Sequence, residues 1–173
     1  MSCLPHSTHR SHYGRWHGKV IITNHITNVP NYIQPCTLEA AYHVASNLRQ
    51  EDLREVVEGH GLQPTVAIPL NSLRGFCVHF TVPDGRIAGL AGIEDDGRVW
   101  MLTTPAILDF PVTFTREAKR FIEGRTESVL WNYVDKRNTV HIKLLKFLGF
   151  TFLEEVPFGP NQLPFIRFER WIH

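Results

Sequence analysis

The stretch that decides the fold is residues 130–150, LWNYVDKRNTVHIKLLKFLGF. Its apolar beginning predicts a strand over residues 128–134, and Asn138 is a residue type that caps helix N-termini. Apolar residues recur after this cap at three- and four-residue steps, namely Val140, Leu144, Leu145 and Leu148. Gly149 follows at the position where many helices end in a left-handed residue. The stretch therefore predicts a strand and a short capped helix with one buried face.

On both sides of this unit the sequence has the period of β-strands. Downstream, residues 151–156 and 164–171 predict two strands around a Pro-Phe-Gly-Pro turn. Upstream, residues 76–82, 87–93 and 99–104 are apolar runs separated by Pro-Asp-Gly and Asp-Asp-Gly. Such turns join antiparallel neighbours, so we expect a three-stranded meander.

Helical patterns fill the remaining segments. After an extended piece at residues 31–34, Thr37 can cap a helix with Glu39 in its first turn. Its expected inward stripe is Leu38, Ala41, Tyr42, Ala45 and Leu48. A second helix is expected over 50–58, with Leu53, Val56 and Val57 inward, and a third over 113–123. Residues 63–73, interrupted by two prolines, stay open between helix and strand.

These elements predict an α/β (α+β) fold in the order β-α-α-β-β-β-α-β-α-β-β. The sheet should be mixed and mostly antiparallel, with helices on both faces. The chain has 173 residues, of which 43% are hydrophobic and 20% charged, which suits one packed domain and excludes a mainly disordered or coiled-coil protein. A net charge of +1 excludes a globally basic nucleic-acid binder. The three scattered cysteines indicate a reducing compartment, and the short apolar runs indicate a protein made in a cytoplasm without a membrane span.

Charge is unevenly placed at the N-terminus. No Asp or Glu precedes Glu39, while Arg10, Arg15 and Lys19 lie before it. Five histidines share this segment: His6, His9, His12, His17 and His25. Their spacing fits no recognised metal site, so we predict no metal and interpret residues 1–29 as a basic arm preceding a domain at 30–173. The candidate partner-binding residues of the arm are Arg10, Arg15, Trp16 and Lys19.

The element order resembles the Gcn5-related N-acetyltransferase (GNAT) fold over residues 31–171. The local sequence is similar to the GNAT-like proteins of short-tailed phages, the group that includes the small internal virion (morphogenesis) protein of T7-like phages. The segments that carry this resemblance are 37–42, 48–52, 99–104, 132–138, 148–150 and 164–168. It implies a virion protein, made in the host cytoplasm, on an acetyltransferase-like fold.

The resemblance also implies where an acyl-CoA would bind. GNAT enzymes hold the CoA diphosphate on backbone N–H groups of a glycine-rich loop, which corresponds here to residues 104–111. This loop has no glycine, Pro105 and Pro111 remove two donors, and Asp109 adds a negative charge. We therefore expect no cofactor. If acetyl-CoA does bind, the weak candidate contacts are Leu102, Thr103, Thr104, Asn132 and Asn138.

A general acid is also missing from its expected place. Many GNAT enzymes have a Tyr seven residues after the helix-opening Asn, and the chain has Leu145 there. If the protein is an enzyme, the candidate catalytic residues are Glu94, His79, Tyr133 and Asn138. Each has a structural alternative, because turn carboxylates are usually solvated and Asn138 is accounted for as a helix cap.

The sequence thus favours a phage virion structural or assembly protein without acetyltransferase activity. The arm would dock onto another virion protein, an acidic protein surface or packaged DNA, and no membrane partner is expected. One alternative is an acyl-CoA-dependent N-acyltransferase that modifies a host or phage amine. Another is an inactive binding module that blocks a host protein.

Overall fold

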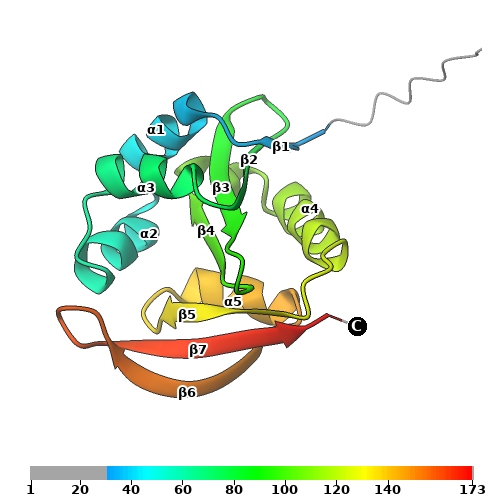
Figure 1. Ribbon diagram of the computed structural model, residues 1–173. Helices are drawn as coiled ribbons and strands as arrows, with labels where there is room; N and C mark the ends of the chain where they lie inside the picture. Colours follow the sequence, from blue (N-terminus) through cyan, green and yellow to red (C-terminus); the bar gives the residue numbers. More distant parts are fainter. Residues whose placement is uncertain (1–30, 173) are drawn as a thin grey trace, which may run out of the picture.

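The computed structural model describes residues 31–172, which form two antiparallel sheets that part like a V (Figure 1). The first sheet has the order β1-β2-β3-β4 and consists of β1 (Ile33–Pro35), β2 (Phe76–Thr81), β3 (Ile87–Ile93) and β4 (Val99–Thr103). The second has the order β5-β7-β6 and consists of β5 (Val129–Asp135), β6 (Thr151–Phe158) and β7 (Leu163–Trp171). A single parallel bridge between Arg98 and Trp131 links the two sheets.

The helices cover both faces of the first sheet and one face of the second. On one side lie α1 (Leu38–Ser46), α2 (Gln50–Arg54), the π-helical turn η1 (Glu55–Gly59) and α3 (Pro64–Ser72). On the other side lie the 3-10 helix η2 (Pro105–Asp109) and α4 (Pro111–Glu123). The last helix, α5 (Thr139–Phe147), packs on the second sheet through Leu144, Leu145 and Leu148.

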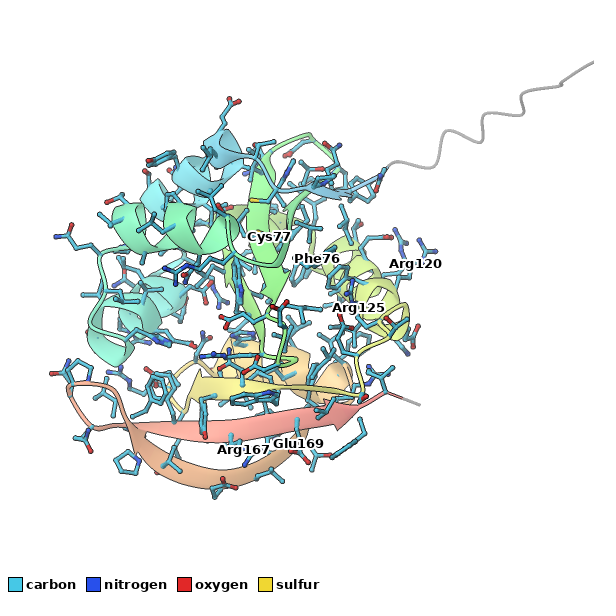
Figure 2. The ribbon with its side chains drawn as sticks, viewed as in Figure 1. Phe76, Cys77, Arg120, Arg125, Arg167 and Glu169 are labelled. Atoms are coloured by element: carbon cyan, nitrogen blue, oxygen red, sulfur yellow. The ribbon has the colours of Figure 1, made fainter. Side chains whose placement is uncertain are left out.

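Local sequence signals account for several element ends. The Thr37 hydroxyl accepts a hydrogen bond from the N–H of Ala40 at 3.1 Å, which confirms the predicted cap of α1. The Asn138 side chain likewise accepts from the N–H of His141, so the predicted cap of α5 is confirmed. Gly149 has φ of +81°, the left-handed conformation expected after this helix. Figure 2 shows how the end of α4 is held at the sheet, where the Arg125 guanidinium lies 4.5 Å from the centre of the Phe76 ring.

The predicted fold class is confirmed, with three differences in detail. Residues 64–72 form the helix α3, because Pro64 occupies its first turn, where no N–H donor is needed. The predicted helix over 50–58 changes to π-helical geometry at Glu55, and Val57 is exposed. In α1 the buried residues are Ala40, Ala41, Val44 and Ala45, so Leu38 and Tyr42, predicted inward, are about half exposed.

No helix within residues 31–172 is both long and apolar enough to cross a membrane. The arm predicted at residues 1–29, including its histidines and Arg10, Arg15, Trp16 and Lys19, lies outside the described residues.

Candidate functional site

A cavity of about 350 Å³ opens where the two sheets part. Its walls are mostly apolar and come from β2, β4, α3, α4, α5 and the second sheet. A few polar side chains reach it, among them Glu55, Glu94, Asn132, Tyr133 and His141. Large apolar cavities with a few converging polar groups are where ligands usually bind, so this cavity is the candidate site.

The edge of β4 that faces this opening is bonded to the chain itself. At Val99, the carbonyl oxygen accepts from the Asn132 amide at 2.8 Å, so a side chain of β5 spans the gap between the sheets. At Thr103, the carbonyl oxygen accepts from the N–H of Arg49 at 2.8 Å, and the N–H donates to Asp52 Oδ2 at 3.0 Å. The Thr103 hydroxyl donates to the same Asp52 oxygen. An extended ligand could pair with this end of β4 only by displacing the start of α2.

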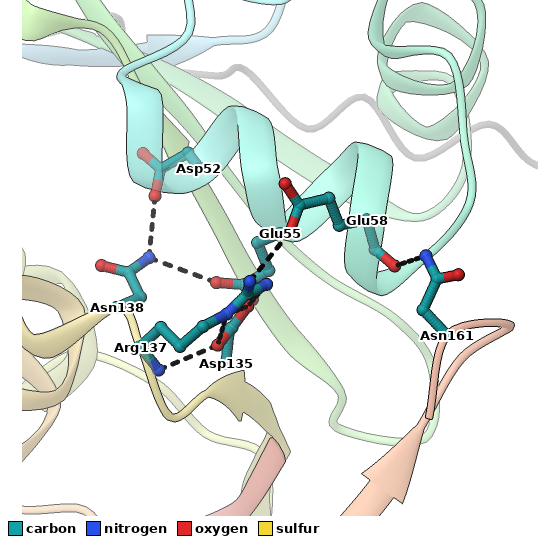
Figure 3. A network of polar contacts seen from close by, with 7 residues as sticks. All are labelled: Asp52, Glu55, Glu58, Asp135, Arg137, Asn138 and Asn161. Atoms are coloured by element: carbon teal, nitrogen blue, oxygen red, sulfur yellow. Dashed lines mark hydrogen bonds and ion pairs between the residues drawn. The ribbon is translucent and has the colours of Figure 1, made fainter. Parts of the chain in front are cut away.

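Asp52 is the centre of a network buried behind that edge (Figure 3). This residue is 2% exposed, and its second carboxylate oxygen accepts from Arg49 Nη2 at 2.9 Å and from Asn138 Nδ2 at 3.1 Å. Asn138 is 1% exposed, and its amide oxygen accepts both from Arg49 Nη2 and from the N–H of His141, at 3.2 Å each. Asn138 thereby joins α5 to the start of α2, and its hydrogen-bonding groups are used in holding the fold.

Glu55 contributes an unusual carboxyl group to the same region. It begins η1, lines the cavity and accepts from Asn138 Nδ2 at 3.2 Å. Burial raises the pKa of Glu55 to about 8; the Asn138 hydrogen bond opposes this rise, and the nearby carboxylates of Asp52 and Asp135 add to it. Burial also lowers the pKa of His141. At neutral pH both side chains are therefore mainly uncharged where they meet the cavity.

Sequence reasoning missed Glu55 and Asp52. Both lie in a segment that has the ordinary pattern of an amphipathic helix, with nothing to mark a buried carboxylate. The available signal was the Arg49–Asp52 spacing of three residues, which suits an ion pair on one helix face.

The loop predicted to meet a diphosphate is folded into η2. The Thr104 hydroxyl accepts from the N–H of Ala106 at 3.3 Å and donates to the Ile87 carbonyl at 3.1 Å. The N–H groups of Ile107 and Phe110 bond to carbonyl oxygens of the same short helix. These backbone donors are directed into the protein itself, and the prolines at 105 and 111 supply none. The N–H groups of Ala106, Ile107 and Phe110 are therefore not free to meet a diphosphate.

The candidate catalytic residues do not all lie in the cavity. Glu94 lines the cavity at the end of β3 and pairs with Arg98 at 2.9 Å. Tyr133 lines it from β5, with its ring 5.6 Å from that of Phe158. His79 lies outside the lining, on β2, where its Nδ1 donates to the Pro35 carbonyl at 2.9 Å. Glu94 and Tyr133 thus share the cavity with Asn132, while His79 holds β1 to β2.

Two further residues named from the sequence, Leu102 and Leu145, line the cavity as apolar side chains. Leu102 also packs with the cluster under α1 and α3, and Leu145 belongs to the core between α5 and the second sheet. Burial raises the pKa of the Cys77 thiol well above its usual range, so this thiol is poorly nucleophilic. Within residues 31–172 no group of His, Cys, Asp and Glu side chains is arranged to hold a metal ion.

A second network lies at the rim of the V. Arg137 donates to Asp135 through Nε and Nη2, at 3.0 and 2.7 Å, and to Glu58 through Nη1 at 2.8 Å. Burial alone would raise the pKa of Asp135, but hydrogen bonds from Arg137 bring it below its usual range. Asn161, in the turn between β6 and β7, donates to the Glu58 carbonyl at 2.8 Å. The second sheet is thereby tied to η1 in two places.

Comparisons with known proteins agree with this architecture. A family model described as "Bacteriophage T7, probable scaffold protein Gp13" matches residues 84–157, from the β2–β3 turn into β6. No curated protein matches the chain.

Solved structures similar to the chain are acetyltransferases. One is a GNAT-family acetyltransferase from Streptococcus pneumoniae, at 14% identity and a TM-score of 0.55, with 82% of this chain and 98% of that chain covered. The putative acetyltransferase yncA from Salmonella typhimurium, solved with acetyl-CoA, has 17% identity and a TM-score of 0.52, covering 82% and 93%. Spermidine N-acetyltransferase from Vibrio cholerae, solved with CoA and spermine, has 10% identity and a TM-score of 0.59, covering 80% and 94%. The chain has the GNAT fold, and the predicted resemblance to a phage GNAT-fold protein is confirmed.

Proposed function

We propose that this GNAT-fold protein, similar over residues 84–157 to a bacteriophage scaffold-protein family, is a structural or assembly component of a phage virion without acyl-CoA chemistry. The observation that carries the proposal is the occupied end of β4, where Arg49 and Asp52 bond both backbone groups of Thr103. Fold alone does not establish activity, so the argument rests on this site.

An acyl-CoA molecule needs two things that this site does not offer. Its diphosphate needs free N–H donors, whereas the N–H groups of Ala106, Ile107 and Phe110 are bonded within the loop and Pro105 and Pro111 have none. Its pantetheine arm is an extended chain with amide groups, and it would have to pass along β4 to bring the acyl group into the cavity. That path meets the buried Asp52, which could move only by breaking its 2.9 Å ion pair with Arg49 and leaving that guanidinium with the longer contact to Glu51, at 3.5 Å.

We further propose that the basic arm at residues 1–29 makes the contact with other virion proteins. What supports this is its charge, since Arg10, Arg15 and Lys19 stand in a segment without carboxylates. Trp16 adds an aromatic side chain of the type enriched at protein interfaces. The matching partner is an acidic protein surface, and packaged DNA is the alternative with the same charge.

The absence of a cofactor is tested by titration calorimetry of the purified full chain with acetyl-CoA and with CoA. We expect no binding with a Kd below about 100 µM. A Kd in the low micromolar range would contradict the proposal and support the N-acyltransferase alternative. In that case Glu94, Tyr133 and Asn132 become the residues to substitute, because they share the cavity.

The assembly role is tested in the phage that encodes the chain, by mass spectrometry of purified particles. We expect the protein in wild-type particles or assembly intermediates and its loss from them in the triple variant Arg10→Ala, Arg15→Ala, Lys19→Ala. The matched control removes the same charge from the domain surface through Lys119→Ala, Lys143→Ala, Lys146→Ala, and should assemble normally. Normal incorporation of the arm variant would refute docking through the arm. Absence of the wild-type protein from all particles would refute the assembly role and leave a binding module that acts on a host protein.

A further inference from the structure

The outer surface of α1 and α3 exposes large apolar side chains, next to polar ones such as Glu39 and His43 of α1. No charged residue occurs from Gly61 to Leu73, a stretch that includes all of α3. The large side chains about half exposed or more on these helices and just after α3 are Leu38, Tyr42, Val66, Leu70 and Leu73. We call these five residues the α1–α3 face. A helix that is apolar all round is normally covered on every side.

The five residues belong to one surface because their helices are neighbours. Helices α1 and α3 pack against each other, and α1 lies on β3 (Figure 1). The inner sides of both helices are already used, since Ala41 and Val44 of α1 and Ile68 of α3 are buried with Leu90 of the sheet. The α1–α3 face therefore points away from the core of its own chain.

The opposite side of the first sheet is covered by a helix with a charged outer surface, so the exposed apolar side chains are particular to the α1–α3 face. Helix α4 covers that side and presents Arg116, Lys119, Arg120 and Glu123 to solvent. Figure 2 shows Arg120 extending from the outer side of α4. One exposed apolar residue stands at its start, Val112, which is 75% exposed. Single residues of this kind are normal at a surface, whereas a continuous apolar patch marks an interaction site.

We propose that the α1–α3 face binds the same face of a second copy of this chain, forming a two-fold symmetric pair. The five side chains are large and 48–67% exposed, so they can form the apolar centre of a standard interface, in which one partner buries ~800 Å². An uncharged face meets its own copy without like-charge repulsion, and interfaces between identical chains are the more apolar class.

The charges beside the face fit the same arrangement. Glu39 follows Leu38 on α1, and Arg74 follows Leu73 at the end of α3. Both are exposed, and neither has an ion-pair partner among residues 31–172. In a two-fold pair every contact occurs twice, so Glu39 of each copy can meet Arg74 of the other. This pairing goes beyond the proposed assembly role and does not depend on the arm.

The test is the mass of the full chain in solution, measured by sedimentation velocity between about 1 and 100 µM. We expect a dimer. Leu70→Glu and, separately, Val66→Glu should raise the dimer Kd about 100-fold or more, because each buries two unpaired carboxylates. Both residues are exposed in the single chain, so circular dichroism should show the variants folded. The matched control Val112→Glu makes the same chemical change on α4 and should leave the dimer intact.

Two results overturn the proposal. One is a wild-type chain that stays monomeric over the whole range, which would mean that another protein or residues 1–30 of the same chain cover the face. The other is a dimer that survives both Leu70→Glu and Val66→Glu. A charge exchange adds a sharper test: Arg74→Glu alone should weaken the dimer, and Arg74→Glu with Glu39→Arg should restore it. Failure of that rescue would overturn the two-fold pairing of these charges.

Discussion

Two networks of the same chemistry cross between the helices and the second sheet, and they differ in burial. The buried network consists of Arg49, Asp52, Thr103 and Asn138, and the rim network of Glu58, Asp135 and Arg137. Figure 3 shows Asp52 and Asn138 of the first network and all three residues of the second. Each joins an arginine to a carboxylate at less than 3 Å. In the first the Arg49 and Asp52 side chains are 6% and 3% exposed. In the second Asp135 is 3% exposed, but the side chains of Arg137 and Glu58 are 35% and 45% exposed.

This difference shows which contacts set the shape of the V. Backbone pairing between the sheets amounts to one bridge, at Arg98 and Trp131, so side chains must fix how the sheets meet. A water-exposed pair exchanges easily with solvent, whereas a buried pair leaves an uncompensated charge when one partner is lost. We therefore expect the buried network to hold the geometry and the rim network to assist it.

The largest effect should come from Asp52→Ala. The substitution removes the acceptor for Arg49, Asn138 and both donors of Thr103, and leaves Arg49 charged in the interior. Loss of one partner of a buried pair costs about 3–5 kcal/mol of unfolding free energy. Urea denaturation followed by circular dichroism measures it.

The control for this variant is Asp84→Ala, which removes an exposed carboxylate from the β2–β3 turn and should not shift the urea midpoint measurably. A loss below about 1 kcal/mol in Asp52→Ala would mean that the buried network does not hold the V.

The second effect is a gain in stability from Glu55→Gln that depends on pH. Burial raises the pKa of Glu55 from 4.5 to about 8, so between these values the folded protein keeps a proton that the unfolded chain has released. The contribution of Glu55 to the free energy of unfolding is therefore fully present below about pH 4.5 and is lost as the pH rises toward 8. Gln is neutral at every pH and can still accept from Asn138, so at pH 7 the variant should be more stable by roughly 1–3 kcal/mol.

Urea midpoints measured from pH 4.5 to 8.5 test this expectation. The difference between Glu55→Gln and wild type should grow with pH and level off above about 8. The control is Glu58→Gln on the same turn. This variant still contains Glu55, so its stability should fall with rising pH in the way that Glu55 imposes on the wild type. A constant difference across this range would show that Glu55 is ionised in the folded protein.

The sequence predicts the parts of this fold that depend on neighbours in the chain. The Thr37 and Asn138 caps, the meander and the glycine after α5 each follow from a few adjacent residues, and all are confirmed. The sequence leaves α3 open between helix and strand because prolines usually interrupt helices, although Pro64 stands in the first turn, where a helix accepts one. The predicted inward side of α1 is wrong because it favours the large apolar residues, whereas the small side chains of its alanines allow close packing on the sheet.

The candidate site is harder to predict from the sequence than the caps and turns, for a physical reason. Asn138 was predicted as a cap, but its bonds to Asp52 and Glu55 join residues 86 and 83 positions apart. No local period encodes such pairs, because they depend on how the two sheets meet. The sequence also does not predict which side of α3 is exposed. In a helix without charged residues, no polar stripe marks the side that the rest of the chain leaves uncovered.

A smaller loss is expected from Arg137→Ala in the rim network. Arg137 is partly exposed and its partner Asp135 is buried, so the loss includes one carboxylate left with fewer donors. We expect about 1 kcal/mol, less than for Asp52→Ala, because solvent can replace part of the lost contacts. The control Arg137→Lys keeps the positive charge but loses the bidentate contact with Asp135, so its free energy of unfolding should lie between those of the wild type and Arg137→Ala. A loss equal to that of Asp52→Ala would contradict the ranking by burial.

The smallest effect should come from Arg86→Ala, which extends the comparison to a network without any buried member, since its three side chains are 41–59% exposed. Arg86 pairs with Asp84 and with Asp109 of η2, at 2.7 Å each, and its hydrogen bonds lower the pKa of Asp84. These distances are as short as those of the rim network, so geometry alone would predict a similar loss. Water and salt screen exposed charges, however, and fixing long side chains costs entropy. We expect no measurable shift of the urea midpoint at physiological ionic strength and a slight loss at low salt. If Arg86→Ala destabilises the protein as much as Arg137→Ala, then contact distance rather than burial determines what these networks contribute.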